Sequence, residues 1–334
     1  MKLRTHIWSL FVVILLGYFG CEDNFSPKSE FENKNIIYCI INVDQRLLPL
    51  APIVILSKNY NYEGTQPPTE NHYTPGIINA IVSLKYGNKI DTFKQFIDLA
   101  PDSNNQFFPN VYYKCRKSPG LDITQKMELE LTAVLPDSNM IAGKTRILEI
   151  LAFDFSYYFV HGITTLIDQW RWGKTWKIMW GANDGNLYFP RFILFYHKSK
   201  EGRDYDYSVE IPMRYVKSGN NNIPLFPTYT RDGFIEYSYA SIDSVVKNIS
   251  LGDSVKSDYT IDGFSIYVVE YDKHLSNFYS STNGYMDFYS IRLDETTYTN
   301  ISGGIGIFGT SMFNSISFEI DRNYAASFGY KKGG

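Results

Sequence analysis

The sequence is poor in cysteine and histidine. Its 334 residues contain only Cys21, Cys39 and Cys115, and five histidines are scattered along the chain. So few thiols exclude a disulfide-dense scaffold and the zinc motifs built from four cysteines. The metal-binding pattern HExxH is also absent. We therefore expect neither a metal site nor a bound cofactor.

Basic runs and familiar catalytic motifs are missing as well. The formal net charge is −3, and no cluster of Lys and Arg would follow a phosphate backbone, so we expect no nucleic-acid partner. The GxSxG turn of serine hydrolases does not occur. Asp154, Ser156 and His161 could be drawn as a catalytic set, but a chain rich in Ser and Asp supplies such sets by chance. The sequence therefore does not predict an enzyme.

The N-terminus has the pattern of a secretory signal. Two basic residues precede an apolar run at residues 7–20, and Cys21 follows directly. The run is shorter than the roughly 20 residues that span a bilayer, which favours a cleaved signal over a retained helix. A cysteine after the cleavage point is typical of bacterial lipoproteins, although Tyr18 and Phe19 depart from the usual lipobox. We expect a signal peptide at 1–20 and lipid attachment at Cys21.

The rest of the chain has a β composition. Tyr (27) and Phe (23) are abundant, and such residues suit pleated, half-buried strands. Residues 21–34 are polar and aperiodic, which indicates a lipidated tether. Short alternating runs separated by turn residues follow, and predict a β-sandwich of transthyretin or immunoglobulin type at 35–149. A second β-rich domain with one or two short helices is expected at 150–325.

Two segments of this second domain are candidates for its short helices. Apolar residues recur at helical spacing through 235–249, which predicts one amphipathic helix. Asp272 follows a strand-like run and is a suitable N-cap for a short helix beginning at Lys273.

Besides Cys21, five positions are candidates for contacts or a disulfide. Trp170, Trp172 and Trp176 could contact a ligand or partner if exposed, because aromatic faces stack on sugars and anchor partners, whereas core packing is the alternative. Cys39 and Cys115 could form a disulfide in an exported protein or remain two buried thiols.

The segment from Gly304 to Gly309 matches the pattern GxGxxG. A dinucleotide site needs this loop between a strand and a helix, whereas a strand-like run follows here. The pattern therefore indicates glycines that allow a bend or a close approach of backbones.

Seven segments between Cys21 and about Ile320 have the pattern of one known family: IIYCIIN, PIVILSKN, GIINAIVSL, MELELTAVLPD, MIAGKTRI, IYVVEYDKHLSNFY and, as the most specific part, TNISGGIGIFGT. Through these segments the chain resembles a Bacteroidota lipoprotein family catalogued as domain of unknown function 4249. The resemblance implies an N-terminal β-sandwich and an outer-membrane location, often beside a TonB-dependent receptor. It implies no catalytic residues.

Taken together, these features predict a lipoprotein of the cell envelope, anchored in the outer membrane. We expect it to act as a binding or accessory module, with an outer-membrane transporter as one candidate partner. A glycan-acting enzyme is an alternative, because the tryptophans and unassigned carboxylates suit sugar chemistry. A structural or adhesive surface protein is another.

Overall fold

The computed structural model describes residues 34–44, 51–58, 76–97, 111–115, 126–154, 174–281 and 298–333, all of which belong to one compact unit. Strands dominate them, and this confirms a mainly β chain with a few short helices. Among these residues no helix is long and apolar enough to cross a membrane. The expected signal peptide and tether, with Cys21, lie outside the described residues, as do Trp170 and Trp172.

The N-terminal region is sandwich-like. One layer contains β3, β6 and β7, the other contains β1, β2 and β5, and β4 pairs with both β3 and β5. The inner faces of the two layers share one hydrophobic cluster. The strands are β1 (Asn35–Asp44), β2 (Ile53–Lys58), β3 (Ile81–Tyr86), β4 (Lys89–Ile97), β5 (Val111–Cys115), β6 (Glu128–Val134) and β7 (Met140–Arg146).

Burial in these strands follows the alternation seen in the sequence. Along β6, Leu129, Leu131 and Ala133 are buried, whereas Glu128 and Glu130 point outward. This is the two-residue period of a strand with one face on a core.

The C-terminal region is also built mainly from strands. Long strands β9 and β14 pair in antiparallel fashion, and β10 forms an edge of the sheet. The elements are β8 (Thr175–Met179), β9 (Leu187–Lys200), β10 (Arg203–Glu210), β11 (Arg214–Ser218), β12 (Asn221–Leu225), β13 (Phe234–Ser238), α3 (Tyr239–Asn248), the 3-10 turn η1 (Lys256–Asp258), β14 (Tyr259–Tyr271), α4 (Lys273–Ser281), β15 (Ile301–Ser302), β16 (Ile305–Phe318), α5 (Arg322–Ser327) and β17 (Lys331–Lys332).

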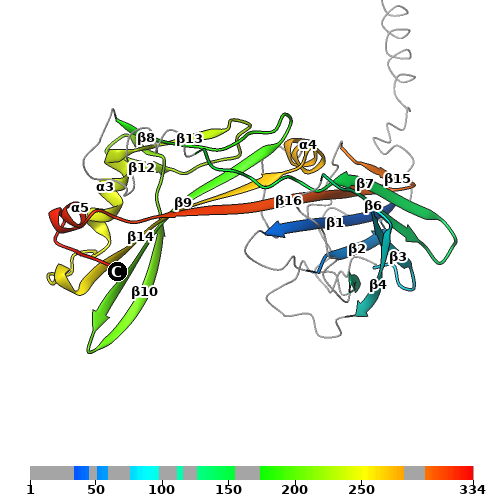
Figure 1. Cartoon of the computed structure of the whole chain (residues 1–334), viewed down its shortest axis with the longest axis horizontal. Coiled ribbons are helices and arrows are strands. Elements are labelled where there is room, and N and C mark those ends of the chain that lie inside the picture. Colours follow the sequence, from blue (N-terminus) through cyan, green and yellow to red (C-terminus); the bar gives the residue numbers. More distant parts are fainter. Residues whose placement is uncertain are drawn as a thin grey trace, which may run out of the picture. The chain divides into compact units, whose positions relative to one another are not determined.

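A single strand joins the two regions. The first part of β16 pairs in parallel with β1, and its last part pairs with β14. β15 pairs with β7, so a segment from the C-terminal part of the chain adds a strand to the layer that contains β3, β6 and β7. Figure 1 shows β16 as a long red strand running from β1 to β14. The sheet therefore crosses the domain boundary expected near residue 149.

The helix expected at 235–249 is shorter in the structure. Ile235 and Tyr237 are buried strand residues, because β13 pairs with β8. The helix α3 begins at Tyr239. Alternate apolar residues at its start satisfy a strand as well as a helix, and the pairing with β8 decides between them. The helix α4 begins at Lys273, as predicted.

Cys39, Cys115 and Trp176, the candidate contact and disulfide residues that the structure describes, are core residues. Cys39 and Cys115 are free and buried, so the disulfide is not formed. Burial raises the pKa of the Cys39 thiol. Trp176 is 6% exposed and packs edge-to-face on Phe192 and Phe318. Its suggested role as a ligand contact is therefore corrected, because the ring has no face left for a ligand.

Candidate functional site

The centre of the candidate site is Asp272, between β14 and α4. Its Oδ1 accepts a hydrogen bond from the backbone N–H of Leu275 at 2.8 Å, which caps α4. Its Oδ2 accepts one from the N–H of Thr310 at 2.9 Å and another from the hydroxyl of Thr145. One carboxylate thus connects α4 with β16 and β7.

The glycine segment allows this arrangement. A Cβ added to Gly309 would clash with the side chain of Leu275 and would lie 3.0 Å from Oδ1 of Asp272. Leu275 is fully buried. The last glycine of the GxGxxG pattern therefore lets α4 pack directly on β16, which is the close-approach role expected from the sequence.

The surroundings of Asp272 include groups that raise the pKa of its carboxyl and groups that lower it. Burial raises the pKa of its carboxyl, whereas the hydrogen bonds from Thr145, Leu275 and Thr310 and the nearby His274 lower it. Both carboxylate oxygens already have protein donors. Asp272 is thus suited to hold elements together rather than to transfer a proton to a substrate.

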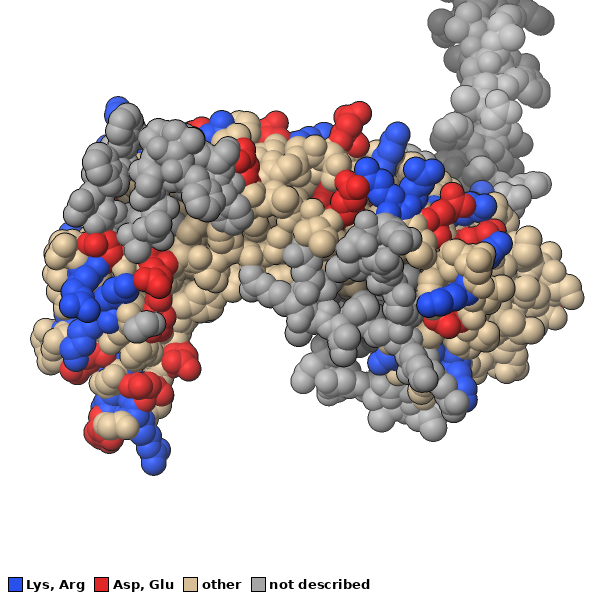
Figure 2. Space-filling view, in the orientation of Figure 1, with Lys and Arg blue, Asp and Glu red and all other residues tan. Residues whose placement is uncertain are grey.

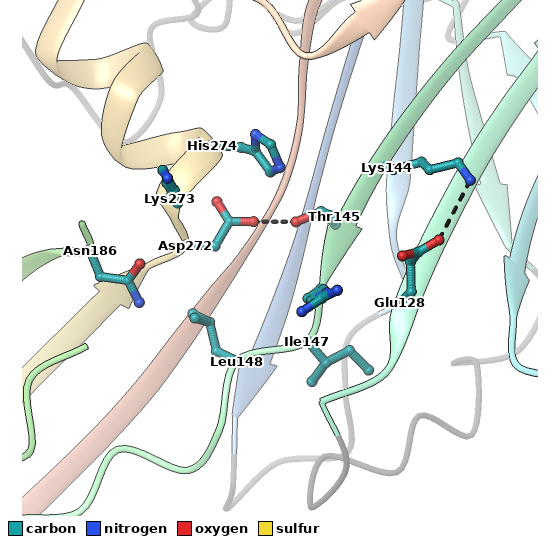
Figure 3. A pocket seen from close by; sticks show the side chains of 10 residues that line it. Glu128, Lys144, Thr145, Ile147, Leu148, Asn186, Asp272, Lys273 and His274 are labelled. Carbon is teal, nitrogen blue, oxygen red and sulfur yellow. Dashed lines mark hydrogen bonds and ion pairs between the residues drawn. The ribbon is translucent and has the colours of Figure 1, made fainter. Parts of the chain in front are cut away.

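A cavity of about 330 Å³ lies beside this carboxylate. Figure 3 shows Thr145 of β7 directed at Asp272, with His274 at the start of α4 nearby. Polar side chains from several elements line the cavity along with Asp272: Glu128, Lys144, Arg146, Asn186, Lys273 and His274.

Positive charge is in excess around this cavity. The Lys144 ammonium lies 3.5 Å from a Glu128 carboxylate oxygen and 3.8 Å from one of Glu130, and the lysine is 60% exposed, so these surface pairs are weak. Arg146 and Lys273 are also exposed, and no ion pair to either occurs among the residues that the structure describes. Figure 2 shows blue and red side chains mixed where Figure 1 places β6 and β7. The arrangement is suited to binding an anionic group.

His274 is held in position by a neighbour. Its Nδ1 lies 2.6 Å from the hydroxyl oxygen of Tyr298, and the two rings are 6.3 Å apart. The side chain is half-buried. A ring fixed in this way is a ready hydrogen-bonding partner at the cavity edge.

A second buried carboxylate supports the wall of the cavity. Glu270 is 0% exposed. Its Oε1 accepts hydrogen bonds from the side chains of Asn183 at 2.8 Å, Asn186 at 2.7 Å and Tyr188 at 3.0 Å. Its Oε2 has no partner among the described residues. Because Asn186 also lines the cavity, Glu270 orients one of the groups that a ligand would meet.

The residues suggested from the sequence do not make up this site. Within the described parts of the chain, no group of three or more His, Cys, Asp and Glu side chains could hold a metal. Sequence reasoning identified Asp272 only as a helix cap and missed Lys144, Arg146 and Lys273. A signal existed, because three segments that carry the family resemblance, at 140–147, 266–279 and 299–310, meet at Asp272.

No family model matches the chain, and no curated protein or solved structure matches it. The family resemblance therefore stays a prediction.

Proposed function

We propose that this protein is a lipid-anchored binding or accessory module of the cell envelope. In this proposal Cys21 carries the lipid and the folded part of the chain lies at the outer membrane. An outer-membrane transporter is its candidate partner. The cavity at Asp272 is the proposed ligand site. The observation that carries the proposal is that Arg146 and Lys273, two exposed cations with no ion pair among the described residues, both line that cavity.

The cavity suits a small anionic ligand. Its volume of about 330 Å³ is at the lower end of typical small-molecule pockets. The guanidinium of Arg146 can pair with a carboxylate or phosphate through two parallel hydrogen bonds, and Lys273 adds a point charge. Asn186 adds a neutral polar group held by Glu270. We propose a ligand that carries at least one carboxylate or phosphate group.

Asp272 is poorly placed to act as a general acid or base. A general acid or base must reach the reacting atom with a free oxygen or nitrogen. Both oxygens of Asp272 are engaged by Thr145, Leu275 and Thr310. Trp176, one of the three tryptophans that motivated the glycan-acting alternative, packs in the core instead of forming a sugar platform.

Replacing Arg146 by Ala tests the ligand site. Citrate and inorganic phosphate are the first probes, measured by isothermal titration calorimetry on the mature chain. We expect the tighter-binding probe to lose about tenfold or more in affinity, because a charge-assisted hydrogen bond contributes about 1.5–3 kcal/mol. Arg203→Ala is the matched control, since Arg203 is exposed on β10 and does not line the cavity. Equal affinity in the two variants would refute the proposed site.

Replacing Cys21 by Ser tests the anchor. A serine cannot take the thioether-linked lipid, so we expect nearly all of the protein to leave the membrane fraction, as measured by flotation and by labelling with a radioactive fatty acid. Cys39→Ser is the control, because Cys39 is a buried free thiol and its loss leaves the lipid in place. Membrane retention of Cys21→Ser would show that another element anchors the chain.

A further inference from the structure

The outer face of the layer formed by β3, β6 and β7 changes from apolar to charged along the strands. At one end Ile81, Val134 and Met140 lie side by side, since Ile81 pairs with Val134 and Val134 pairs with Met140. Their exposed fractions are 64%, 37% and 60%. We name these three residues the apolar row. Exposed apolar side chains in adjacent register form a continuous patch, whereas single ones are common on any surface.

The next positions on the same face become progressively more polar. Ser83 pairs with Thr132, and Thr132 pairs with Ala142. Two residues further along, the neighbours are Lys85, Glu130 and Lys144. All of these side chains share one face of the layer, because residues two apart in a strand point the same way. Within these three strands the apolar row is therefore confined to one end, whereas at the other end Lys85 pairs with Ile90 of β4, which is 65% exposed.

The end of the layer that bears the apolar row also lies beside the start of β1, the first described strand. A Cβ on Gly304 would lie 2.6 Å from the carbonyl oxygen of Asn35, the first residue of β1. A Cβ on the preceding Gly303 would clash with the carbonyl oxygen of Met140. Gly303 therefore contacts Met140 of the apolar row, and the next residue, Gly304, contacts Asn35. The start of β1 thus lies beside the apolar row. Figure 1 likewise shows β1 beginning at the end of the sandwich that holds the turn between β6 and β7.

We propose that the apolar row is the surface of this protein that enters the membrane interface. The inference rests on the proposed lipid anchor at Cys21. Residues 21–34 separate the lipid from Asn35, and a chain of that length spans at most about 50 Å when fully extended and about 20 Å as a flexible coil. The anchor thus holds the end that bears the apolar row close to the bilayer.

Two further observations favour a bilayer as the occupant. Lys58 is exposed and pairs with Asn35 across β1 and β2, so a cation lies at the same end, where lipid phosphates would be. The opposite end of the face bears charges that a bilayer would reject. The orientation also places Arg146 and the cavity away from the lipid, since six residues along β7 correspond to about 20 Å.

Site-directed spin labelling tests this orientation. Met140→Cys and Lys85→Cys are made in the full chain, and the mature lipidated proteins are reconstituted into vesicles of phosphatidylethanolamine and phosphatidylglycerol. The native Cys39 and Cys115 are buried, so the label reacts at the introduced thiol. Lys85 is the matched control on the same face. If substitution at Met140 prevents folding, Ile81→Cys replaces it.

In vesicles we expect the label at residue 140 to exclude a water-soluble nickel chelate and to retain access to oxygen. Interfacial side chains lie about 5–10 Å into the headgroup boundary, so the ratio of chelate to oxygen access should fall about threefold or more relative to residue 85. Equal ratios in protein that floats with the vesicles would overturn the orientation alone. Protein that does not float would overturn the anchor and the orientation together. Spectra broadened by spin–spin coupling would place a second copy on the row and overturn the assignment to lipid.

Discussion

Asp272→Ala is expected to lower the free energy of unfolding by about 3–5 kcal/mol. The change removes the cap of α4 and leaves the N–H of Thr310 and the hydroxyl of Thr145 without their acceptor in a buried environment. Each buried donor without a partner costs about 1–3 kcal/mol, and a lost cap costs about 1 kcal/mol. The sum is reduced because the variant no longer buries a charge, the effect that raises the pKa of Asp272.

Asp321→Ala is the matched control for this prediction. Asp321 caps α5 through the N–H groups of Asn323 and Tyr324, which is the same local role as that of Asp272. It is only partly buried, so its loss should cost about 1 kcal/mol. Urea denaturation of the mature chain, followed by tryptophan fluorescence, gives both values. Equal losses would show that Asp272 acts only as a cap and does not hold β7 and β16 to the helix.

Gly306→Ala is expected to destabilise the fold by a similar amount, about 3–5 kcal/mol. Gly306 has a φ of +121° and lies opposite Ile37 in the parallel pair of β1 and β16. A Cβ there would clash with the carbonyl oxygen of Ile37. The substitution therefore strains the backbone and forces apart the two strands whose pairing joins the N-terminal and C-terminal parts of the sheet.

Gly202→Ala separates these two effects. Gly202 has a φ of +77° in the turn between β9 and β10, and no atom lies within 4 Å of an added Cβ. Only the backbone penalty applies, which is about 1 kcal/mol. The midpoints of urea denaturation and the near-ultraviolet circular dichroism of the two variants provide the comparison. If Gly306→Ala were no more harmful than Gly202→Ala, the contact with Ile37 would be loose.

Much of the fold could be predicted because it is local. The alternation in β6 and β7, the cap at Asp272 and the structural role of Gly304 to Gly309 all follow from residues close in the chain. Strand period, capping and glycine geometry depend on neighbouring residues, so a single sequence carries them. The candidate site was harder to predict from the sequence, because Lys144, Arg146 and Lys273 are ordinary surface residues when each is viewed alone.

The sequence by itself determined that the chain is mainly β and where its hairpins and helix caps lie. Only the tertiary structure decided that β16 pairs with both β1 and β14, that Ile235 belongs to a strand, and that Trp176 is in the core. It also brought the end of β7 to Asp272 and so created the cavity. These features depend on contacts between residues far apart in the chain. The alternation of apolar residues along a strand does not indicate which distant strand it pairs with, so the sequence pattern alone could not predict them.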